Sequence, residues 1–220
     1  MSPRIEHFVG RDDDMVKICE ALQHDGARKT AVVHGLGGMG KTQLALAYEK
    51  RHREEYSAVF WINSKDVNTL QQGYVAAAKR IYRDHPLLID FKAAAEGSDL
   101  AEAMETVRRW LNQPKNTRWL IICDNYDTPK FPGRDDLGTF DIRSFLPEVD
   151  HGAILITTRS SQLDLGSPIT VKKLQKIEHS LGILSHVSKR DGLSSGMPAS
   201  PWYYVAAADP LLRPQCPNIG

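Results

Sequence analysis

The chain has 220 residues, of which 41% are hydrophobic and 25% charged, as in an ordinary globular protein with one good-sized domain. The formal net charge is only +1, so a basic nucleic-acid-binding module is poorly supported. No apolar run reaches the ~18 residues of a membrane span, and the N-terminus lacks a hydrophobic signal core. The cysteines Cys19, Cys123 and Cys216 lie far apart, which disfavours a disulfide framework or zinc site and leads us to expect a cytoplasmic protein.

Helices and strands are predicted to alternate along the first part of the chain. Apolar residues at helical spacing predict helices over 12–24, from the glycines after residue 34 to about Arg53, and over 66–82. Short apolar runs predict buried strands over 29–35 and 57–63. The segment 84–97, with Pro86 and Gly97, is expected to be irregular.

The same alternation continues beyond it. A helix is predicted over 98–111, strands over 118–125, 152–159 and 167–174, a loop over 127–141, and a short helix from Lys176 to about His186. The last 33 residues, 188–220, hold five of the chain's 12 prolines and no clear period, and we expect a disordered tail there. The pattern predicts an α/β fold with a mainly parallel five-stranded sheet.

A glycine-rich stretch follows the first predicted strand. Residues 35–42, GLGGMGKT, match the pattern G-x-x-x-x-G-K-[ST] of phosphate-binding loops. A loop that wraps a polyphosphate turns its backbone N–H groups inward, and glycine tolerates the angles that this requires. We therefore expect the nucleotide phosphates to lie against the backbone of this loop and of the residue after it: Gly35, Gly37, Gly38, Met39, Gly40, Lys41, Thr42 and Gln43. The alternative is a flexible glycine turn.

Lys41, Thr42 and Asp124 complete the expected site. Lys41 is predicted to reach the β- and γ-phosphates, and the Thr42 hydroxyl to bind Mg²⁺. Asp124 ends the strand WLIICD, where a parallel sheet would direct it to the same edge, and we expect it to hold the magnesium through water. Alone, Asp124 could be a loop cap. A dehydrogenase loop is disfavoured, because Lys41-Thr42 and Asp124 suit a triphosphate with magnesium.

Five stretches together resemble one family. FVGRDDDMVKICEAL, AVVHGLGGMGKTQLALAYEKRH, AVFWINS, WLIICDNYD and GAILITTRS come in the order seen in NB-ARC proteins of the STAND class of P-loop NTPases. This class includes plant disease-resistance receptors and fungal NLR-like proteins. The residues of these stretches look most like those of fungal and bacterial members. The resemblance covers about residues 5–185 and implies a P-loop NTPase three-layer sandwich that binds ADP or ATP with Mg²⁺.

The resemblance implies further site residues. The Val9 backbone would touch adenine, and Arg11 would face the phosphates; a solvated Arg11 is the alternative. Arg159, at the end of ILITTR, resembles an arginine that senses the γ-phosphate. It can do so only if the fourth strand lies beside the phosphate strand; otherwise it is a surface arginine.

The family's catalytic acid is missing. Members with strong ATPase activity place a Glu directly after the magnesium Asp, whereas this chain has Asn125. An amide cannot accept the proton of the attacking water. Asp127 is the candidate substitute, and we expect slow hydrolysis or none. The domain would then act as a switch in which ADP and ATP favour different arrangements.

The parts that flank the core in this family are expected to be short or missing. Residues 1–27 would form the VGR segment and a helix, 28–172 the NTPase core, and 173–187 the start of an ARC-like helical region. GMPAS, residues 196–200, is taken as a coincidental match to the family's Gly-x-Pro motif. Because the family motif begins near residue 8, we expect no N-terminal effector domain and read the chain as a nucleotide-binding core, truncated after it.

Three functions stay open at this point. The leading one is an ADP/ATP-binding signalling switch, with self-association or an effector protein as candidate contacts and neither nucleic acid nor membrane as a partner. The second is an active P-loop ATPase or kinase-like phosphotransferase. The third is a degenerate protein that folds poorly without its ARC helices, which would leave an exposed sheet edge.

Overall fold

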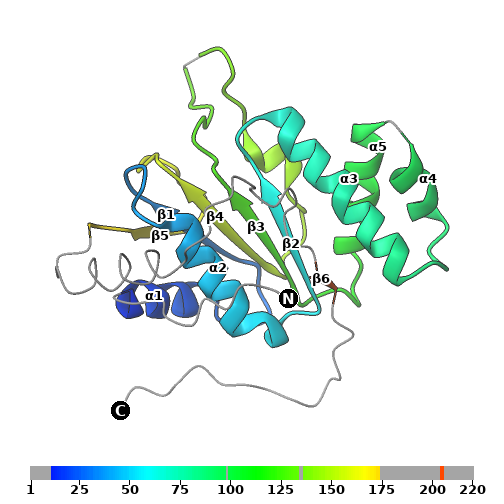
Figure 1. Cartoon of the computed structure of the whole chain (residues 1–220), viewed down its shortest axis with the longest axis horizontal. Coiled ribbons are helices and arrows are strands. Elements are labelled where there is room, and N and C mark those ends of the chain that lie inside the picture. Colours follow the sequence, from blue (N-terminus) through cyan, green and yellow to red (C-terminus); the bar gives the residue numbers. More distant parts are fainter. Residues whose placement is uncertain (1–10, 98, 134–135, 174–203, 206–220) are drawn as a thin grey trace, which may run out of the picture.

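A computed structural model describes residues 11–97, 99–133 and 136–173, and the backbone of 204–205. Val9, the helix expected from Lys176 to His186, GMPAS and most of the expected tail lie outside these residues. The described residues form one α/β unit around a twisted sheet (Figure 1).

Five parallel strands make the body of the sheet. They are β1 (Lys29–His34), β2 (Ala58–Asn63), β3 (Trp119–Asp124), β4 (Ala153–Thr158) and β5 (Ser167–Thr170), in the spatial order β5-β1-β4-β3-β2. The predicted mainly parallel five-stranded sheet is confirmed. In the segment expected to be disordered, two residues differ: Tyr204–Val205 form β6, which pairs antiparallel with β2 at the sheet edge.

The strand order decides which loops meet. β4 lies between β1 and β3 and pairs in parallel with both. All five strands therefore end at one edge of the sheet, with the segments that follow β1, β3 and β4 side by side. The expected role of Arg159 requires the strand that ends before it to lie beside the strand that precedes the glycine loop. This condition is met, because β4 directly neighbours β1.

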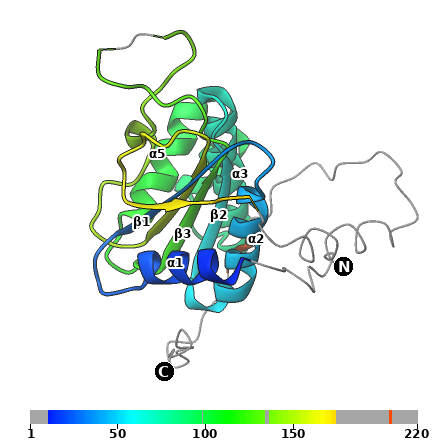
Figure 2. The ribbon, with the colours of Figure 1, turned by 90° about the vertical axis from the view of Figure 1, so that its left-hand side faces the viewer.

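Helices cover both faces of the sheet. On one face lie α1 (Asp12–Leu22) and α2 (Lys41–His52), and on the other lie α3 (Val67–Asp84), α4 (Asp90–Glu96) and α5 (Leu100–Leu111). Figure 2 views this arrangement from the β5 edge. Two 3₁₀ turns, Arg53–Glu55 and Ile142–Phe145, complete the described elements. The predicted three-layer sandwich is thus present.

Strand alternation divides the core into two halves. In β3, Leu120 and Ile122 pack with α1 and α2, whereas Ile121 and Cys123 pack with α3, α4 and α5. All six β3 residues are buried, because a central parallel strand has helices on both of its faces. Asp124 is the last residue of β3 and therefore lies where this buried strand reaches the edge of the sheet.

The expectation of an irregular segment at 84–97 was wrong for half of that segment. Asp90–Glu96 form α4, in which Phe91, Ala94 and Ala95 are buried against α3 and α5. These three residues lie at the i, i+3, i+4 spacing of one helical face. The helix is only seven residues long, so its stability comes from this packing rather than from local propensity.

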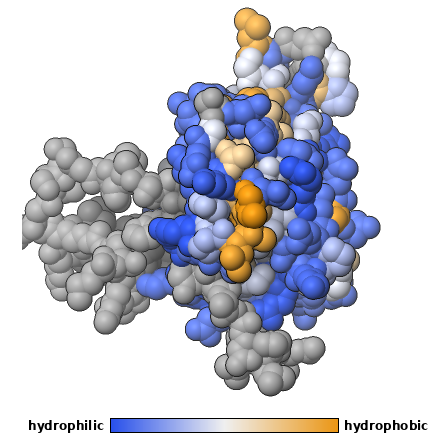
Figure 3. All heavy atoms as spheres, turned by 90° about the vertical axis from the view of Figure 1, so that its right-hand side faces the viewer, coloured by the Kyte–Doolittle hydropathy of each residue, from blue (hydrophilic) through white to orange (hydrophobic). Residues whose placement is uncertain are grey.

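The outer surface of the described residues is mostly polar, with a few exposed apolar side chains. Figure 3 shows hydrophobic side chains gathered on the face that the helices α3 to α5 form. Leu87 and Ile89, between α3 and α4, are 92% and 77% exposed. Within the described part of the chain, no helix is both long and apolar enough to cross a bilayer.

Candidate functional site

The loop between β1 and α2 has a backbone that requires glycine at three positions. Gly35, Gly38 and Gly40 have φ values of +151°, +74° and +83°, which side-chain-bearing residues rarely adopt. At Gly35 a Cβ would also lie 2.6 Å from the Val171 carbonyl oxygen. The sequence pattern is therefore explained by backbone geometry as well as by room for a ligand.

The loop leads directly into the N-terminus of α2. Gly40 precedes the helix and offers no capping side chain, and Leu44 N donates to Gly40 O at 2.9 Å to open the helical ladder. The first N–H groups of α2, at Lys41, Thr42 and Gln43, therefore point toward the loop with the positive end of the helix dipole. This end of the helix is suited to a phosphate.

Lys41 lies inside the curve of the loop. Its Nζ donates to Gly35 O at 2.8 Å and to Leu36 O at 3.0 Å. Partial burial lowers the pKa of Lys41 below its ordinary value, the charge of Asp127 opposes that shift, and Arg159 adds to it. The ammonium group is thus held by loop carbonyls close to both Asp127 and Arg159.

Thr42 and Asp124 meet across the sheet edge. Thr42 Oγ1 donates to the Asp124 carboxylate, at 2.9 Å from Oδ1 and 3.2 Å from Oδ2. Asp124 is only 4% exposed, and Thr157 Oγ1, from β4, donates to its Oδ1 at 2.5 Å. The carboxylate is therefore fixed by two hydroxyl groups, one from α2 and one from the neighbouring strand.

These oxygens fit a magnesium ion that is only partly held by protein. Mg²⁺ commonly takes one or two protein oxygens and completes its shell with water and substrate phosphates. Thr42 and Asp124 supply such a pair next to the loop. No group of three or more His, Cys, Asp or Glu side chains suited to a metal occurs among the residues that the structure describes, so a site built from protein ligands alone is absent there.

Asn125 and Asp127 follow Asp124 in a sharply turned segment. Asn125 has φ +64°, its N–H donates to Thr157 Oγ1 at 3.0 Å, and its Nδ2 donates to Asp124 Oδ2 at 3.3 Å. Both oxygens of Asp127 contact Arg159: Oδ1 accepts from the backbone N at 2.8 Å, and Oδ2 lies 2.8 Å from Nε. Each group that could assist hydrolysis is thus engaged with a neighbour.

Arg159 lies over the loop. Its side chain is 68% exposed, and a Cβ placed on Gly37 would be 3.8 Å from its Cζ. The guanidinium group is therefore beside the glycine-rich loop and open to solvent.

Arg11 holds the loop from its other side. Nη2 donates to Met39 O at 2.8 Å, and Nη1 donates to Lys172 O at 2.6 Å and pairs with Asp14 at 3.1 Å. Its side chain is only 10% exposed, so the alternative of a solvated charge does not apply. Arg11 connects α1, the loop and the segment after β5.

Thr157 is a site residue that the sequence analysis did not single out. It was included only as part of an apolar strand, because nothing in ILITT marks one threonine as directed at Asp124. The parallel register places it opposite Val33 of β1, at the same height as the loop. The role of Thr157 becomes apparent only from the strand order, in which β4 lies between β1 and β3.

Comparison with known proteins supports the predicted resemblance. No protein-family model matches the chain. Over 164 residues it is 27% identical to a nucleotide-binding leucine-rich repeat (NLR)-like protein of Hyaloscypha variabilis. Over 182 residues it is 23% identical to an Arabidopsis thaliana protein whose name assigns it to disease resistance. The predicted similarity to NB-ARC proteins is confirmed by these two relatives.

These matches involve a small part of each relative. They cover 70% and 78% of this chain but 16% and 15% of the relatives' lengths. Among solved structures, Cdc6p from Pyrobaculum aerophilum aligns with a TM-score of 0.55 and 13% identity, over 86% of this chain and 52% of that one. This likeness concerns the fold alone and agrees with the predicted α/β fold.

Proposed function

We propose that the chain binds ADP or ATP together with Mg²⁺ and acts as a nucleotide-dependent switch. The observation that carries the proposal is the contact of Thr42 Oγ1 with Asp124, 2.9 Å apart, beside a loop whose glycines turn its backbone inward. A phosphate-binding loop and a magnesium-holding acid on neighbouring sheet segments are the two parts that such a nucleotide site needs.

Each part of the loop has a separate task in this proposal. The N–H groups from Gly35 to Gln43 bind phosphate oxygens, and Lys41 exchanges its two carbonyl partners for the β- and γ-phosphates. Thr42 and Asp124 hold the metal, which when bound would neutralise phosphate charge. Arg11 keeps the loop in place through Met39 O, and Val9 is proposed to touch adenine.

Slow hydrolysis follows from Asn125 and Asp127, in the segment after Asp124. Asn125 has no basic group and donates its amide to Asp124. Asp127 stays the candidate base, but its ion pair with Arg159 restrains it. If Arg159 turns toward a γ-phosphate, this ion pair breaks, and the segment after β3 is released. That exchange is the proposed difference between the ADP and ATP forms.

The relatives' names give further support. One of them is named as a nucleotide-binding protein and the other for disease resistance. Because the chain spans only about a sixth of their length, a role in signal transduction, contact with an effector protein, self-association and a cytoplasmic location are all parts of the proposal. The choice of adenine over guanine rests on the family resemblance.

Two measurements on the purified chain test this function. Chromatography of the nucleotide released on denaturation is expected to show ADP or ATP. Steady-state phosphate release from ATP is expected to be far below the ~10 s⁻¹ typical of enzymes, and Lys41→Ala is expected to abolish nucleotide retention. Lys50→Ala is the matched control, since Lys50 is exposed at the other end of α2. Turnover near ~10 s⁻¹ would instead establish the alternative, an active ATPase or phosphotransferase.

A further inference from the structure

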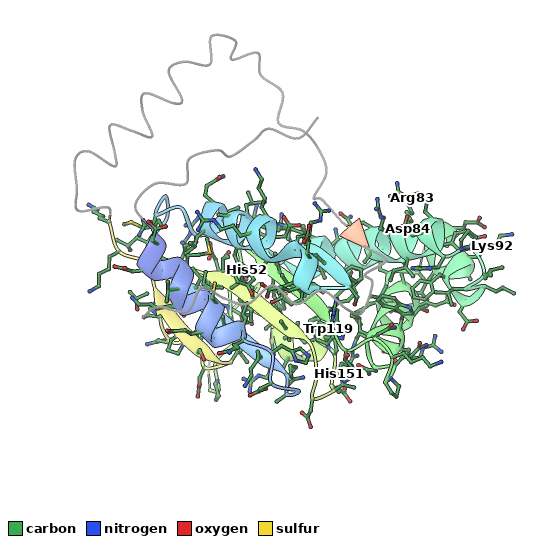
Figure 4. All side chains as sticks on the ribbon, turned by 90° about the horizontal axis from the view of Figure 1, so that it is seen from below. His52, Arg83, Asp84, Lys92, Trp119 and His151 are labelled. Carbon is green, nitrogen blue, oxygen red and sulfur yellow. The ribbon has the colours of Figure 1, made fainter. Side chains whose placement is uncertain are left out.

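A second cluster of reactive groups lies between α1 and α2, among residues that the proposed nucleotide site does not use. Cys19 Sγ, on α1, lies 3.2 Å from His52 Nε2, at the end of α2. His52 Nδ1 lies 2.7 Å from Glu55 Oε1, in the 3₁₀ turn that follows α2. Figure 4 labels His52 on the side of the sheet where these two helices pack.

The two contacts determine which nitrogen of the His52 imidazole carries the proton. Because a carboxylate only accepts, Glu55 fixes the ring proton on Nδ1 and leaves the lone pair of Nε2 toward the thiol. The Tyr48 ring stacks on His52, with centroids 4.7 Å apart and an interplanar angle of 22°. A nucleophile, a base and an orienting acid are thus within hydrogen-bonding distance of one another in turn, which is the arrangement that activates cysteine thiols elsewhere in proteins.

The position of Cys19 permits reaction with a small molecule. Cys19 is partly exposed, and the side chains of His52 and Glu55 are 12% and 29% exposed. Cys123 provides a contrast within the same chain. It is buried in β3, and burial raises the pKa of its thiol to about 12, so Cys123 is expected to be inert at neutral pH.

We propose that Cys19 is a modification site: a thiol that His52 and Glu55 activate for oxidation by hydrogen peroxide. The thiol proton passes to His52 Nε2, and Glu55 stabilises the imidazolium. The thiolate sulfur attacks one peroxide oxygen, an S–O bond forms and the O–O bond breaks. The departing hydroxide takes the proton from His52 and leaves as water. Sulfur is oxidised to a sulfenic acid, and the peroxide is reduced to water.

The test is the rate of sulfenic acid formation at Cys19 in the full chain. The protein is treated with hydrogen peroxide at pH 7 in the presence of dimedone, and the peptides containing Cys19 and Cys123 are quantified by mass spectrometry. We expect Cys19 to be labelled about tenfold faster than free cysteine, which is only a few per cent thiolate at this pH, and Cys123 to stay unlabelled. His52→Gln is expected to lower the Cys19 rate about tenfold, and Glu55→Gln to lower it by less.

Two controls keep the outcome decisive. His24→Gln changes an exposed histidine just beyond α1 and is expected to leave the rate unchanged. Thermal melts followed by circular dichroism show whether His52→Gln is folded; if it is not, Glu55→Gln decides, because that change leaves the ring in place. Two results would overturn the proposal. One is a Cys19 rate in folded His52→Gln or Glu55→Gln equal to that of the wild type, and the other is a wild-type rate no higher than that of free cysteine. The labelling rates and the thermal melts are measured without nucleotide. A failure of the Cys19 proposal can therefore be distinguished from a failure of the proposed nucleotide switch.

Discussion

Thr42 and Asp124 are separated by 82 residues of sequence, yet the Thr42 hydroxyl donates to the Asp124 carboxylate over 2.9 Å. Thr42 is the second residue of α2, immediately after the glycine loop, and Asp124 ends β3, which is separated from β1 by β4. The parallel order of the sheet brings both residues to one edge. The proposed function depends on this contact.

Thr157 is expected to position Asp124 for metal binding. Thr157→Val removes the hydroxyl that donates to Asp124 and leaves the shape of the side chain nearly unchanged. We expect a loss of about 1–3 kcal/mol in unfolding free energy, because the buried carboxylate loses a donor. The affinity for Mg²⁺ in the nucleotide complex should fall about 10- to 100-fold.

Thr158→Val is the matched control for this change. Thr158 is also buried, but its Oγ1 accepts a hydrogen bond from Ser160 N and does not contact Asp124. Calorimetric titration of ADP at several Mg²⁺ concentrations distinguishes the two variants. An equal loss of magnesium dependence in both would contradict the assigned role of Thr157.

Nucleotide affinity is expected to fall at alkaline pH. Burial lowers the pKa of Lys41 in the free protein, and phosphate binding requires the protonated ammonium group. As pH rises through this lowered pKa, Lys41 loses its proton and affinity decreases, at a lower pH than an ordinary lysine would give. Titrations of ADP between about pH 7 and 10 measure the effect.

Lys41→Arg is the companion variant for the pH series. A guanidinium group stays charged over this range, so the alkaline loss of affinity should disappear, whatever the effect on affinity at neutral pH. The same decline in Lys41→Arg as in the wild type would show that another group is responsible.

Two glycines of the loop should respond differently to alanine. Gly35→Ala places a Cβ 2.6 Å from Val171 O at φ +151° and is expected to cost ~2 kcal/mol or more of unfolding free energy. Gly37→Ala meets only Arg159, at 3.8 Å, without a positive φ, and should stay within about 0.5 kcal/mol of the wild type. Urea denaturation of both variants compares them; equal losses would contradict the described loop conformation.

Any residual hydrolysis is expected to depend on Asp127. The charge of Asp127 acts on Lys41 more strongly than that of Asp124 does, which indicates a position close to the loop. Asp127→Asn should lower slow phosphate release by about 100-fold or more, the lower end of the range for loss of a general base. Asp136→Asn, an exposed acid in the same loop, should have no effect. A rate unaffected by Asp127→Asn would exclude Asp127 as the base.

The sequence predicted much of the sheet and of the site because their signals are local. The strands β1 to β4 each contain an apolar run bounded by polar or glycine residues, and their observed bounds lie close to the predicted ones. The strand β5 has a single buried residue, Ile169, and ends at Thr170, short of the predicted bound at 174. The loop was identifiable because GLGGMGKT combines backbone freedom with a lysine and a threonine at fixed spacing. Asp124 followed from the rule that parallel strands end at one edge.

Features that depend on tertiary packing were not predictable in the same way. The helix α4 is too short for its period to stand out, and only contact with α3 and α5 explains it. Thr157 could be assigned only after β4 was placed between β1 and β3. The pairing of Cys19 with His52 joins two helices that are separate in sequence, and no sequence motif predicts this contact.

The most direct test of the central claim is calorimetric titration of ADP into the wild-type chain and into Asp124→Asn, each with Mg²⁺ and with EDTA. The account predicts that the wild type binds ADP, and that Mg²⁺ strengthens binding at least about tenfold. Asp124→Asn should retain the magnesium-free affinity and lose the enhancement. Absence of ADP binding by the folded wild type, or an undiminished magnesium effect in Asp124→Asn, would contradict it.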